Sequence, residues 1–310
     1  MRLSILIPAY NEAESLPALL DALREHAAPF APYEIVVVDD GSTDGTGELL
    51  ARLAMEDPRL GYARLGRNYG KSAALAVGFA RTRGDVVVTM DADLQDDPAE
   101  LPALLATLDE GWDLVSGWKK ERRDPIDKTL PSKVWNAMLR RVSGLTLHDF
   151  NCGLKAYRSE VARGLRLYGD LHRYVPVLAA WQGWRVTEIP VRHHPRRFGV
   201  SKYGARRFLN GILDLFTVTF IHRRGAAPLH LFGRIAAALL AVGLLINLYF
   251  AVVWAITQTL RVRPLLILGL ILVVLGFQTA SLGLLGELMI HLRGREEEYR
   301  IAEEREPRGD

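Results

Sequence analysis

Short apolar runs alternate with longer helical patterns over the first 200 residues of the chain. Runs typical of strands buried on both faces of a mostly parallel sheet lie at 3–8, 34–40 and 85–93. Weaker strand signals lie at 61–65, 113–117 and 185–191, and helical patterns lie at 14–26, 45–55, 71–81 and 98–110. Because strands and helices alternate, the pattern predicts an α/β fold with right-handed crossovers and an open, doubly wound sheet.

The hydrophobic pattern changes in the last third of the chain. Residues 235–256 and 265–285 contain no charged side chain, and at about 1.5 Å per residue each run can cross the ~30 Å hydrocarbon core of a bilayer. The short connector at 257–264 therefore predicts a transmembrane helical hairpin. Arginines flank both outer ends of this hairpin, which favours the cytoplasm for those ends and for the N-terminal domain. A hairpin buried in a large soluble core is the alternative.

The segment at 201–224 joins these two regimes. Its hydrophobic residues, among them Phe208, Ile212 and Phe216, fall on one helical face, which is typical of a helix in the membrane interface or of an ordinary core-facing helix. The predicted organisation is a globular domain at 1–200, an amphipathic juxtamembrane segment at 201–230, two transmembrane helices at 231–290 and a charged cytoplasmic tail, helical or frayed, at 291–310. The first apolar run is too short for a secretory signal. From the predicted hairpin and its flanking arginines we expect a multi-pass protein of the inner (cytoplasmic) membrane.

Composition sharpens this interpretation only in part. The chain has 310 residues, 49% of them hydrophobic, which excludes a disordered or collagen-like protein. The single cysteine, Cys152, excludes an internal disulfide framework and a cysteine-based zinc site. With 39 basic and 36 acidic residues the formal net charge is +3, so we expect no nucleic-acid partner. The near-zero mean hydropathy of +0.06 averages a polar domain with two apolar spans.

Acidic side chains follow the predicted strand at 85–93. The stretch MDADLQDD at 90–97 places Asp91 and Asp93 two residues apart at the carboxyl end of that strand, where open α/β sheets bind ligands. Two neighbouring carboxylates repel unless a cation lies between them, and such oxygen ligands, with the Gln95 carbonyl, suit Mg²⁺ or Mn²⁺. The motif therefore predicts a metal site, and a solvated acidic turn is the alternative.

Two other strand ends carry polar side chains. In IPAYNEAESL at 7–16, Tyr10 offers a ring that can stack on a base and Glu12 offers an acceptor, and in VVVDDGSTDGT at 36–46, Asp39 and Asp40 close a strand. Simple capping turns are the alternative for both. Because carboxyl ends of parallel strands meet at one sheet edge, we expect these side chains to share a crevice with Asp91.

The ordered motifs PAYNE, VDDGSTDGT, RNYGKSAALAVGF and DADLQDDP resemble those of family 2 glycosyltransferases. They are most similar to the polyprenyl-phosphate branch, which includes dolichol-phosphate mannose synthases, and the likeness extends from Leu3 through the C-terminal hairpin. The resemblance implies a GT-A domain, which is Rossmann-like with a mostly parallel sheet, followed by an amphipathic interface helix and a two-helix transmembrane hairpin. It further implies inverting transfer of a hexose from a UDP- or GDP-hexose to an undecaprenyl or dolichyl phosphate at the cytoplasmic face of the membrane.

Site residues follow from this resemblance by matching motifs. It implies a metal, Mg²⁺ or Mn²⁺, at Asp91, Asp93 and Gln95, with Asp93 also counted as catalytic. It implies substrate contacts from Pro8, Tyr10, Glu12, Asp39, Asp40 and Ala92, and from Lys71 near the diphosphate or the acceptor. Where relatives often have Gly-Ser-Arg, this chain has Gly117, Trp118 and Lys119, so Lys119 keeps the charge but loses the bidentate fork of arginine.

The resemblance also implies an acceptor side of the site. Arg197, Ser201 and Lys202 would form a basic loop that closes on the phosphates or meets anionic lipid. Asp149, in LHDFNCGLKAY at 147–157, matches an acidic residue beside the acceptor. A phosphate monoester has a second pKa of about 6 and is largely a dianion at pH 7. Asp149 is therefore either a base or a residue that positions the acceptor or completes the metal site.

Two further motifs are near-misses. GRNYGKS at 66–72 has one residue too few between its glycines for a phosphate-binding P-loop. QGWRV at 182–186 resembles the Gln-x-x-Arg-Trp signature of processive polysaccharide synthases but has Val186 in place of tryptophan. Transfer to another glycolipid or polysaccharide, and a non-catalytic membrane protein that retains a GT-A domain, stay as alternatives. The sequence leaves open the sugar, the nucleotide, the lipid length and whether the chain forms a homo-oligomer.

Overall fold

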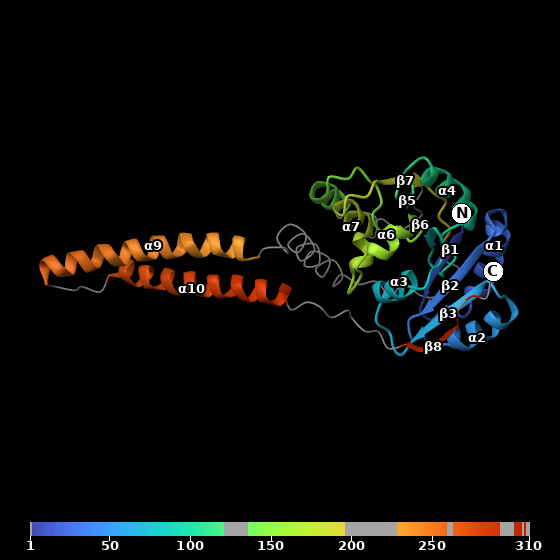
Figure 1. Cartoon of the computed structure of the whole chain (residues 1–310), viewed down its shortest axis with the longest axis horizontal. Helices are drawn as coiled ribbons and strands as arrows, with labels where there is room; N and C mark the ends of the chain where they lie inside the picture. The colour runs from blue at the N-terminus through green and yellow to red at the C-terminus, as the bar shows by residue number, and fades with distance from the viewer. Residues whose placement is uncertain are drawn as a thin grey trace. The chain divides into compact units, whose positions relative to one another are not determined.

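The structure, a computed structural model, describes residues 2–120, 136–195, 228–258, 263–291, 301–305 and 307. The chain divides into two units, one formed by residues 1–214 and 298–310 and the other by residues 215–297. In Figure 1 the first unit contains the β-sheet and its helices, and the second contains two long helices. Each unit is described by itself below.

One mixed sheet organises the first unit. Its order is β7-β5-β6-β4-β1-β2-β3-β8, and its strands are β1 (Leu3–Ala9), β2 (Tyr33–Asp39), β3 (Leu60–Leu65), β4 (Val86–Thr89), β5 (Leu114–Trp118), β6 (Lys155–Arg158), β7 (Val186–Pro190) and β8 (Ile301–Arg305). Strands β4, β1, β2 and β3 are parallel neighbours. β6 runs antiparallel between β4 and β5, and β8 runs antiparallel along β3.

Helices connect the strands on both sides of this sheet. They are α1 (Leu16–Ala27), α2 (Thr46–Glu56), α3 (Lys71–Phe79), α4 (Leu101–Asp109), α6 (Ser159–Gly164) and α7 (Val175–Trp181), with short 3₁₀ turns at Ala28–Phe30, Pro98–Glu100 and Leu171–Tyr174. Residues 136–143 are also helical. The core forms where aliphatic side chains of β1, β2 and β4, such as Ile5, Val37 and Val88, pack with leucines of α1 and α4. This burial on both sheet faces explains the continuous apolar runs of the strands.

Every strand and helix predicted within residues 1–200 is present, and strands β6 and β8 and helices α6, α7 and 136–143 are additional to the prediction. The amphipathic segment predicted at 201–230 lies, up to residue 227, outside the described residues. The strand expected at 85–93 ends at Thr89, and the acidic motif after it lies in a loop. The sequence did not predict β6, which has only four residues. It also did not predict β8, because 291–310 was expected to be a helical or frayed tail. Instead Ile301–Arg305 pairs with Tyr62–Leu65, so that expectation is wrong for these five residues.

The tail strand is fixed by more than main-chain pairing. Arg81 forms an ion pair with Glu304 at 2.6 Å, and Arg83 donates a hydrogen bond to the carbonyl of Pro307 at 3.5 Å. The Pro307 ring packs on Gly61, where a Cβ would lie 2.5 Å from Pro307 Cδ. A strand beyond β3 also covers main-chain groups that an open sheet edge would expose.

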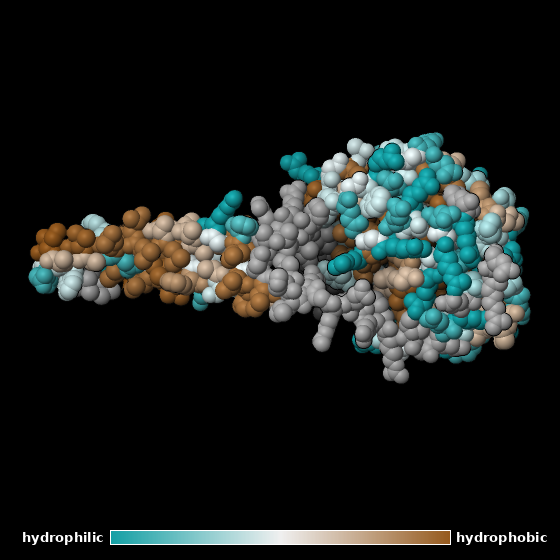
Figure 2. All heavy atoms as spheres, in the orientation of Figure 1, coloured by the Kyte–Doolittle hydropathy of each residue, from teal (hydrophilic) through white to brown (hydrophobic). Residues whose placement is uncertain are grey.

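The second unit is a pair of long apolar helices, α9 (Pro228–Thr257) and α10 (Pro264–His291). Both are long and apolar enough to cross a membrane, and only 17% and 11% of their most apolar windows are buried. Figure 2 shows hydrophobic side chains along much of both helices. The helices approach closely at small residues, since a Cβ on Gly243 would lie 2.9 Å from the Gly269 carbonyl oxygen. Such close approach at glycine is common between helices in membranes.

Candidate active site

Three neighbouring strands bring the predicted site residues to one edge of the sheet. Ala9 at the end of β1 is level with Asp39 at the end of β2, and Leu6 of β1 is level with Thr89 at the end of β4. Pro8 in β1 and Tyr10 just after it, Asp39 at the end of β2 and Asp91 after β4 therefore come to the same carboxyl edge. This is the arrangement in which open α/β sheets bind ligands.

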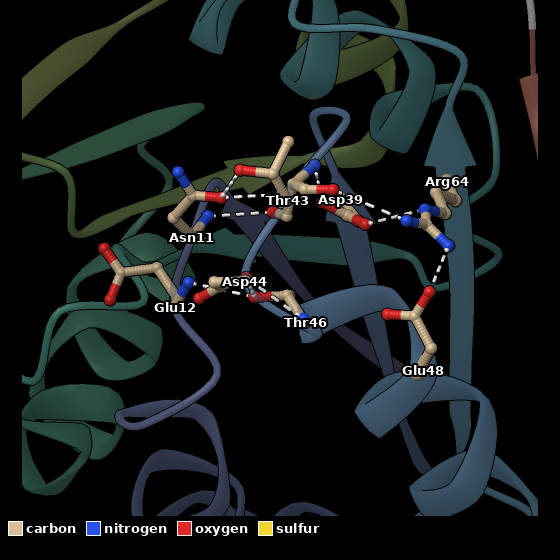
Figure 3. Close-up of polar contacts among 9 residues, drawn as sticks. Asn11, Glu12, Asp39, Thr43, Asp44, Thr46, Glu48 and Arg64 are labelled. Carbon is tan, nitrogen blue, oxygen red and sulfur yellow. Dashed lines mark hydrogen bonds and ion pairs between the residues drawn. The ribbon is translucent and has the colours of Figure 1, made fainter.

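The loops that follow β1 and β2 are joined by hydrogen bonds (Figure 3). The Asn11 side chain accepts from the Thr43 N–H at 2.9 Å, and the Asn11 N–H donates to Ser42 Oγ at 2.8 Å. The Glu12 N–H donates to Thr46 Oγ1 at 3.0 Å. Asn11 has a φ of 57°, a left-handed conformation that asparagine tolerates better than most residues. These contacts explain the polar residues of both motifs and fix the backbone beside Tyr10 and Glu12.

The backbone and the side chain of Glu12 make different hydrogen bonds. Its backbone belongs to the joined loops, whereas its carboxylate accepts a hydrogen bond from the Ser15 hydroxyl at 2.6 Å. In Figure 3 this carboxylate points away from the Asp39 and Arg64 side chains. The structure thus keeps it apart from the acid at the end of β2.

The two acids after β2 have different environments. Asp39 is fully buried and lies between the Ser42 N–H at 2.9 Å and Arg64 Nε at 3.4 Å. Asp40 accepts from the Tyr69 N–H at 2.7 Å and the Gly70 N–H at 2.8 Å. Burial raises the pKa of Asp40 despite these two hydrogen bonds. Asp40 therefore holds the loop that leads into α3 and positions Lys71, the first residue of that helix.

Asp91 lies at the centre of a group of lysines. Its carboxylate accepts a short hydrogen bond from Lys71. Burial would raise the pKa of Asp91, but the charges of Lys71, Lys119 and Lys155 outweigh burial and hold the pKa at about 2. The backbone of Gly153 packs directly on the carboxylate, because a Cβ on this glycine would lie 2.5 Å from Asp91 Cγ. Asp91 is thus an anion whose position is fixed from two sides.

The other proposed metal ligands lie in the same loop. Asp93 is nearly buried, and its carboxylate accepts from the Gln95 N–H at 3.2 Å. The Gln95 side-chain amide lies 3.5 Å from the His194 carbonyl oxygen. Ala92, between the two acids, is buried. Asp97 caps the next turn by accepting from the Ala99 N–H at 2.9 Å, as expected for an acid at a helix start.

The donor set fits a hard divalent cation. In the described part of the chain no three His, Cys, Asp or Glu side chains form a ready metal cage. Mg²⁺ is usually held by one or two carboxylates together with substrate phosphates and water, rather than by an all-protein cage. Asp91 and Asp93 meet that requirement, because they bring two carboxylates into one loop at the carboxyl edge of the sheet. Lys71 is the present partner of Asp91 in this structure.

A second group of acidic and basic side chains lies near Asp91, since the charge of Lys119 acts on it. Lys119 pairs with Asp96 at 3.3 Å, and although burial lowers the pKa of Lys119, Asp96 and its neighbours raise it overall. Asp149 is 2% exposed and accepts from the Asn151 N–H at 3.1 Å. Its charge also acts on Lys119. Burial raises the pKa of the Cys152 thiol to about 12, so this thiol is a structural group.

Two residues of the site were missed by the sequence analysis. Glu188 on β7 accepts from the backbone N–H groups of His148 and Asp149, at 2.8 and 3.2 Å, and so fixes the turn that carries Asp149. Lys155, the first residue of β6, lines a pocket with Pro8, Lys71 and Asp91. Glu188 belongs to no recognisable local motif. Lys155 lies in the stretch LHDFNCGLKAY at 147–157, but nothing in that stretch marks it as a site residue, because only the fold brings it to the pocket. The predicted Arg197, Ser201 and Lys202 lie outside the described residues.

Comparisons with known proteins agree with this geometry. A model of the family described as glycosyl transferase family 2 matches residues 4–166, which is more than half of the chain. A dodecaprenyl-phosphate galacturonate synthase of Rhizobium johnstonii is 35% identical over 296 residues, covering 93% of this chain and 88% of that protein. An undecaprenyl-phosphate 4-deoxy-4-formamido-L-arabinose transferase of Klebsiella pneumoniae is 36% identical over 292 residues, covering 92% of this chain and 87% of that protein.

Solved structures share the fold at lower identity. Glucosyl-3-phosphoglycerate synthase of Mycobacterium tuberculosis, in complex with Mn²⁺, UDP-glucose and phosphoglyceric acid, superposes with a TM-score of 0.53 at 21% identity, over 69% of this chain and 79% of that one. A mannosyltransferase of Pyrobaculum calidifontis, in complex with GDP-mannose and Mn²⁺, gives a TM-score of 0.52 at 22% identity, over 95% of this chain and 76% of that one. The GT-A fold and the family resemblance are thereby confirmed, and the chain belongs to glycosyl transferase family 2.

Proposed function

We propose that the protein transfers a hexose, with inversion, from a nucleotide diphosphate sugar to a polyprenyl phosphate. The observation that carries the proposal is the position of Asp91, paired with Lys71 and followed in the same loop by Asp93, at the sheet edge that Pro8 and Asp39 also reach. The two relatives above, each covering more than nine-tenths of the chain, are named for dodecaprenyl-phosphate and undecaprenyl-phosphate substrates. A family fold alone would not support a substrate class.

The donor is proposed to lie across the ends of β1, β2 and β4. Tyr10 offers a ring to the nucleoside, and the loop fixed by Asn11 and Ser42 offers polar groups. The buried Asp39 is proposed to lie beneath the nucleoside. Asp91, Asp93 and the Gln95 carbonyl would hold Mg²⁺ or Mn²⁺. A bound divalent cation would neutralise charge on the diphosphate leaving group. The Mn²⁺ complexes of proteins that share this fold support that use of the acidic motif.

The acceptor side needs no proton transfer. A lipid phosphate oxygen forms the bond to the anomeric carbon, while the bond to the nucleoside diphosphate breaks and its electron pair leaves on the diphosphate. Because a phosphate monoester is largely ionised at pH 7, no side chain has to remove a proton. Asp149, buried and held by Asn151 and by the turn that Glu188 fixes, is proposed to position the acceptor side of the site.

Three observations support a membrane location with the catalytic domain on the cytoplasmic side. Helices α9 and α10 are long and apolar enough to span a bilayer. Strand β8 follows α10 in the chain and pairs with β3 in the catalytic sheet, so in a spanning hairpin the chain would enter and leave the membrane on the same side. Arginines near these ends favour the cytoplasm.

The proposal is tested by label transfer in membranes. Membranes of a bacterial host that contain the full chain are incubated with undecaprenyl phosphate and, in parallel, with radiolabelled UDP-hexoses, UDP-hexuronate and GDP-mannose. We expect one of these labels to enter the organic-soluble lipid fraction, and not to do so in membranes without the chain. Label in a water-insoluble polymer would favour a polysaccharide synthase instead, and no transfer from any donor would contradict the proposal.

A further inference from the structure

One arginine joins three elements at the nucleoside side of the proposed donor site. Arg64, in β3, forms ion pairs with Asp39 at 3.4 Å and with Glu48 at 3.0 Å. In Figure 3 its side chain lies between these two carboxylates. It also donates a hydrogen bond to the main-chain carbonyl of Ser42 at 3.4 Å. The guanidinium therefore connects the end of β2, the loop after it and the first turn of α2.

The backbone of Arg64 is fixed from both sides of β3. It is level with Asp39 of β2 and with Glu303 of β8. The register with β8 shifts between Arg64 and Leu65, and such irregularities commonly re-aim a side chain. The pairing with two strands therefore fixes the point on β3 from which the Arg64 side chain reaches Asp39.

The space for the guanidinium comes from a glycine in the first turn of α2. A Cβ on Gly47 would lie 2.7 Å from Arg64 Cζ and 2.8 Å from Arg64 Nε. Glycine within a helix is less stable than alanine, so Gly47 weakens α2 locally. What this glycine provides is room for the Arg64 side chain beside Asp39, and any larger residue at this position would have to displace it.

Arg64 and Asp39 together hold both main-chain polar groups of Ser42. The Ser42 N–H donates to Asp39 Oδ1 at 2.9 Å, while the Ser42 carbonyl accepts from Arg64. Ser42 Oγ in turn accepts from the Asn11 N–H at 2.8 Å, and Asn11 directly follows Tyr10. A continuous series of contacts therefore leads from Arg64 to the backbone beside the ring that is proposed to meet the nucleoside.

We propose that Arg64 is a positioning residue for the nucleoside side of the donor site, acting through Asp39 and Ser42. This inference rests on the proposed function. The Asp39 carboxylate is fully buried and needs a cation or hydrogen-bond donors to stay in place, and Arg64 is paired with it. The metal loop after β4 has separate contacts of its own. Loss of the guanidinium should therefore weaken binding of the nucleoside and spare binding of the diphosphate.

The test measures binding to the full chain purified in detergent. The ligands are UDP and GDP, each with Mn²⁺, and pyrophosphate with Mn²⁺, which has two phosphates but no nucleoside. Arg64→Met removes the charge, and Gly47→Ala keeps the charge but displaces the guanidinium. Asp39→Asn and the double variant that combines it with Arg64→Met complete a double-mutant cycle. Arg52→Met is the matched control, since Arg52 is exposed on the same helix as Gly47.

We expect Arg64→Met to weaken binding of the preferred nucleoside diphosphate about tenfold, the effect of one charged hydrogen bond, and to leave pyrophosphate binding unchanged. Gly47→Ala should cause a similar loss with little change in melting temperature, because alanine favours a helix. The double variant should lose no more than Asp39→Asn alone, since Arg64 acts through Asp39. Arg52→Met should bind all three ligands as the wild-type chain does.

Three results would overturn the inference. The first is unchanged binding of nucleoside diphosphate to Gly47→Ala, which decides the question even if Arg64→Met does not fold. The second is an equal loss of nucleoside diphosphate and pyrophosphate, which would make the arginine a support of the whole domain. The third is additive losses in the double variant, which would mean that Arg64 acts independently of Asp39.

A different result would count against the proposed function itself. If the wild-type chain bound neither UDP nor GDP more tightly than pyrophosphate, the nucleoside side of the donor site would not exist as proposed. Failure of the inference and failure of the proposed function are therefore distinguishable, because the first appears only in the variants and the second already appears in the wild-type chain.

Discussion

Lysines pair with carboxylates at the candidate site. Each pair gives a role to residues whose role the local sequence alone leaves ambiguous. Lys71 pairs with Asp91 and Lys119 pairs with Asp96. The acidic motif could be predicted because Asp-x-Asp after an apolar strand is a local pattern. Glu188 could not, because it comes from a distant strand and no motif surrounds it. Lys155 lies in the motif at 147–157, but only the fold shows that it reaches the pocket lined by Asp91.

Asp93 provides the most direct test at the scale of a residue. We expect Asp93→Asn to lower sugar transfer by about a hundredfold or more, since it removes one of two carboxylates from a site that counters phosphate charge. Asp97→Asn in the same loop is the matched control, because asparagine also caps a helix start and Asp97 has that structural role. Equal losses of transfer in both variants, measured at saturating Mn²⁺, would contradict the assignment of Asp93 to the metal.

We predict that sugar transfer requires glycine at position 153, because the absence of a side chain there leaves room for the Asp91 carboxylate. A Cβ there would lie 2.5 Å from Asp91 Cγ, so Gly153→Ala must displace the carboxylate or the backbone just before β6. A displacement of about 1 Å at a reacting centre can cost on the order of a hundredfold in rate. Gly164→Ala is the control, since its Cβ would meet only Gln182 Oε1 at 3.4 Å. A Gly153→Ala chain with wild-type turnover would show that Asp91 need not stay where it is.

The environment of Asp57 makes the stability of the folded chain depend on pH. It accepts from Arg24 Nε at 2.9 Å and Arg59 Nε at 3.0 Å, and although burial raises its pKa, these hydrogen bonds lower it below the ordinary value. A depressed carboxyl pKa stabilises the folded state above the unfolded pKa of about 3.9, and this contribution fades as the pH falls through that value towards the folded pKa.

We therefore expect Asp57→Asn to lower the free energy of unfolding by about 1–3 kcal/mol at pH 7, and by less as the pH falls below about 4. Denaturant unfolding of the full chain in detergent at pH 7, 5 and 3.5 measures this difference. Asp21→Asn, which removes the 74% exposed partner of Arg24, should change stability little. A difference between Asp57→Asn and wild type that stays constant over this range would exclude the ionised carboxylate as its cause.

At the scale of elements, the parallel strands were predictable and the antiparallel ones were not. β1, β2 and β4 are buried on both faces and appear as continuous apolar runs. β6 has four residues beginning with a lysine, which is too short for a periodic signal. β8, with the sequence IAEER, lies at the sheet edge, and its main chain rather than an apolar pattern makes the pairing. Its charged side chains therefore resembled a solvated tail.

Deletion of residues 301–310 tests the role of β8. The pairing with β3 covers Tyr62–Leu65, so we expect faster amide hydrogen exchange in β3, and self-association of the purified chain through the exposed edge. Glu304→Ala is the matched control. It removes only a partly exposed ion pair with Arg81, which is worth about 1 kcal/mol or less. Unchanged exchange at β3 after the deletion would show that the tail strand does not protect this edge.

At the scale of the whole molecule, the chain combines a domain with a polar surface and a hairpin whose surface is apolar. The hairpin was predictable because two long uncharged runs have few explanations other than a bilayer. The two helices, Pro228–Thr257 and Pro264–His291, extend beyond the uncharged runs at 235–256 and 265–285. The helical backbone therefore continues past the ends of these runs. The return of the chain to the catalytic sheet was not predictable, because it depends on a partner strand more than 230 residues earlier.

The return of the chain to the catalytic sheet after α10 predicts the membrane topology, which can be measured by labelling introduced cysteines. The native Cys152 is buried, so single cysteines can be introduced at Met55, which is 68% exposed in the catalytic domain, and at Gln258, just after α9. A membrane-impermeant maleimide should label Met55→Cys only in inside-out vesicles and Gln258→Cys only in right-side-out ones. Labelling of both positions from one side would mean that the hairpin does not span the bilayer.

The most direct measurement is mass spectrometry of the lipid product made by the purified full chain. The chain is supplied with undecaprenyl phosphate, Mn²⁺ and the nucleotide sugar that gives label transfer in membranes. The account predicts one new lipid whose mass equals undecaprenyl phosphate plus one sugar residue. It also predicts release of one nucleoside diphosphate for each lipid formed, and formation of both products about a hundredfold or more slowly by Asp93→Asn. A product that carries the sugar on any acceptor other than the lipid phosphate, or the same lipid made by Asp93→Asn at the wild-type rate, would contradict it.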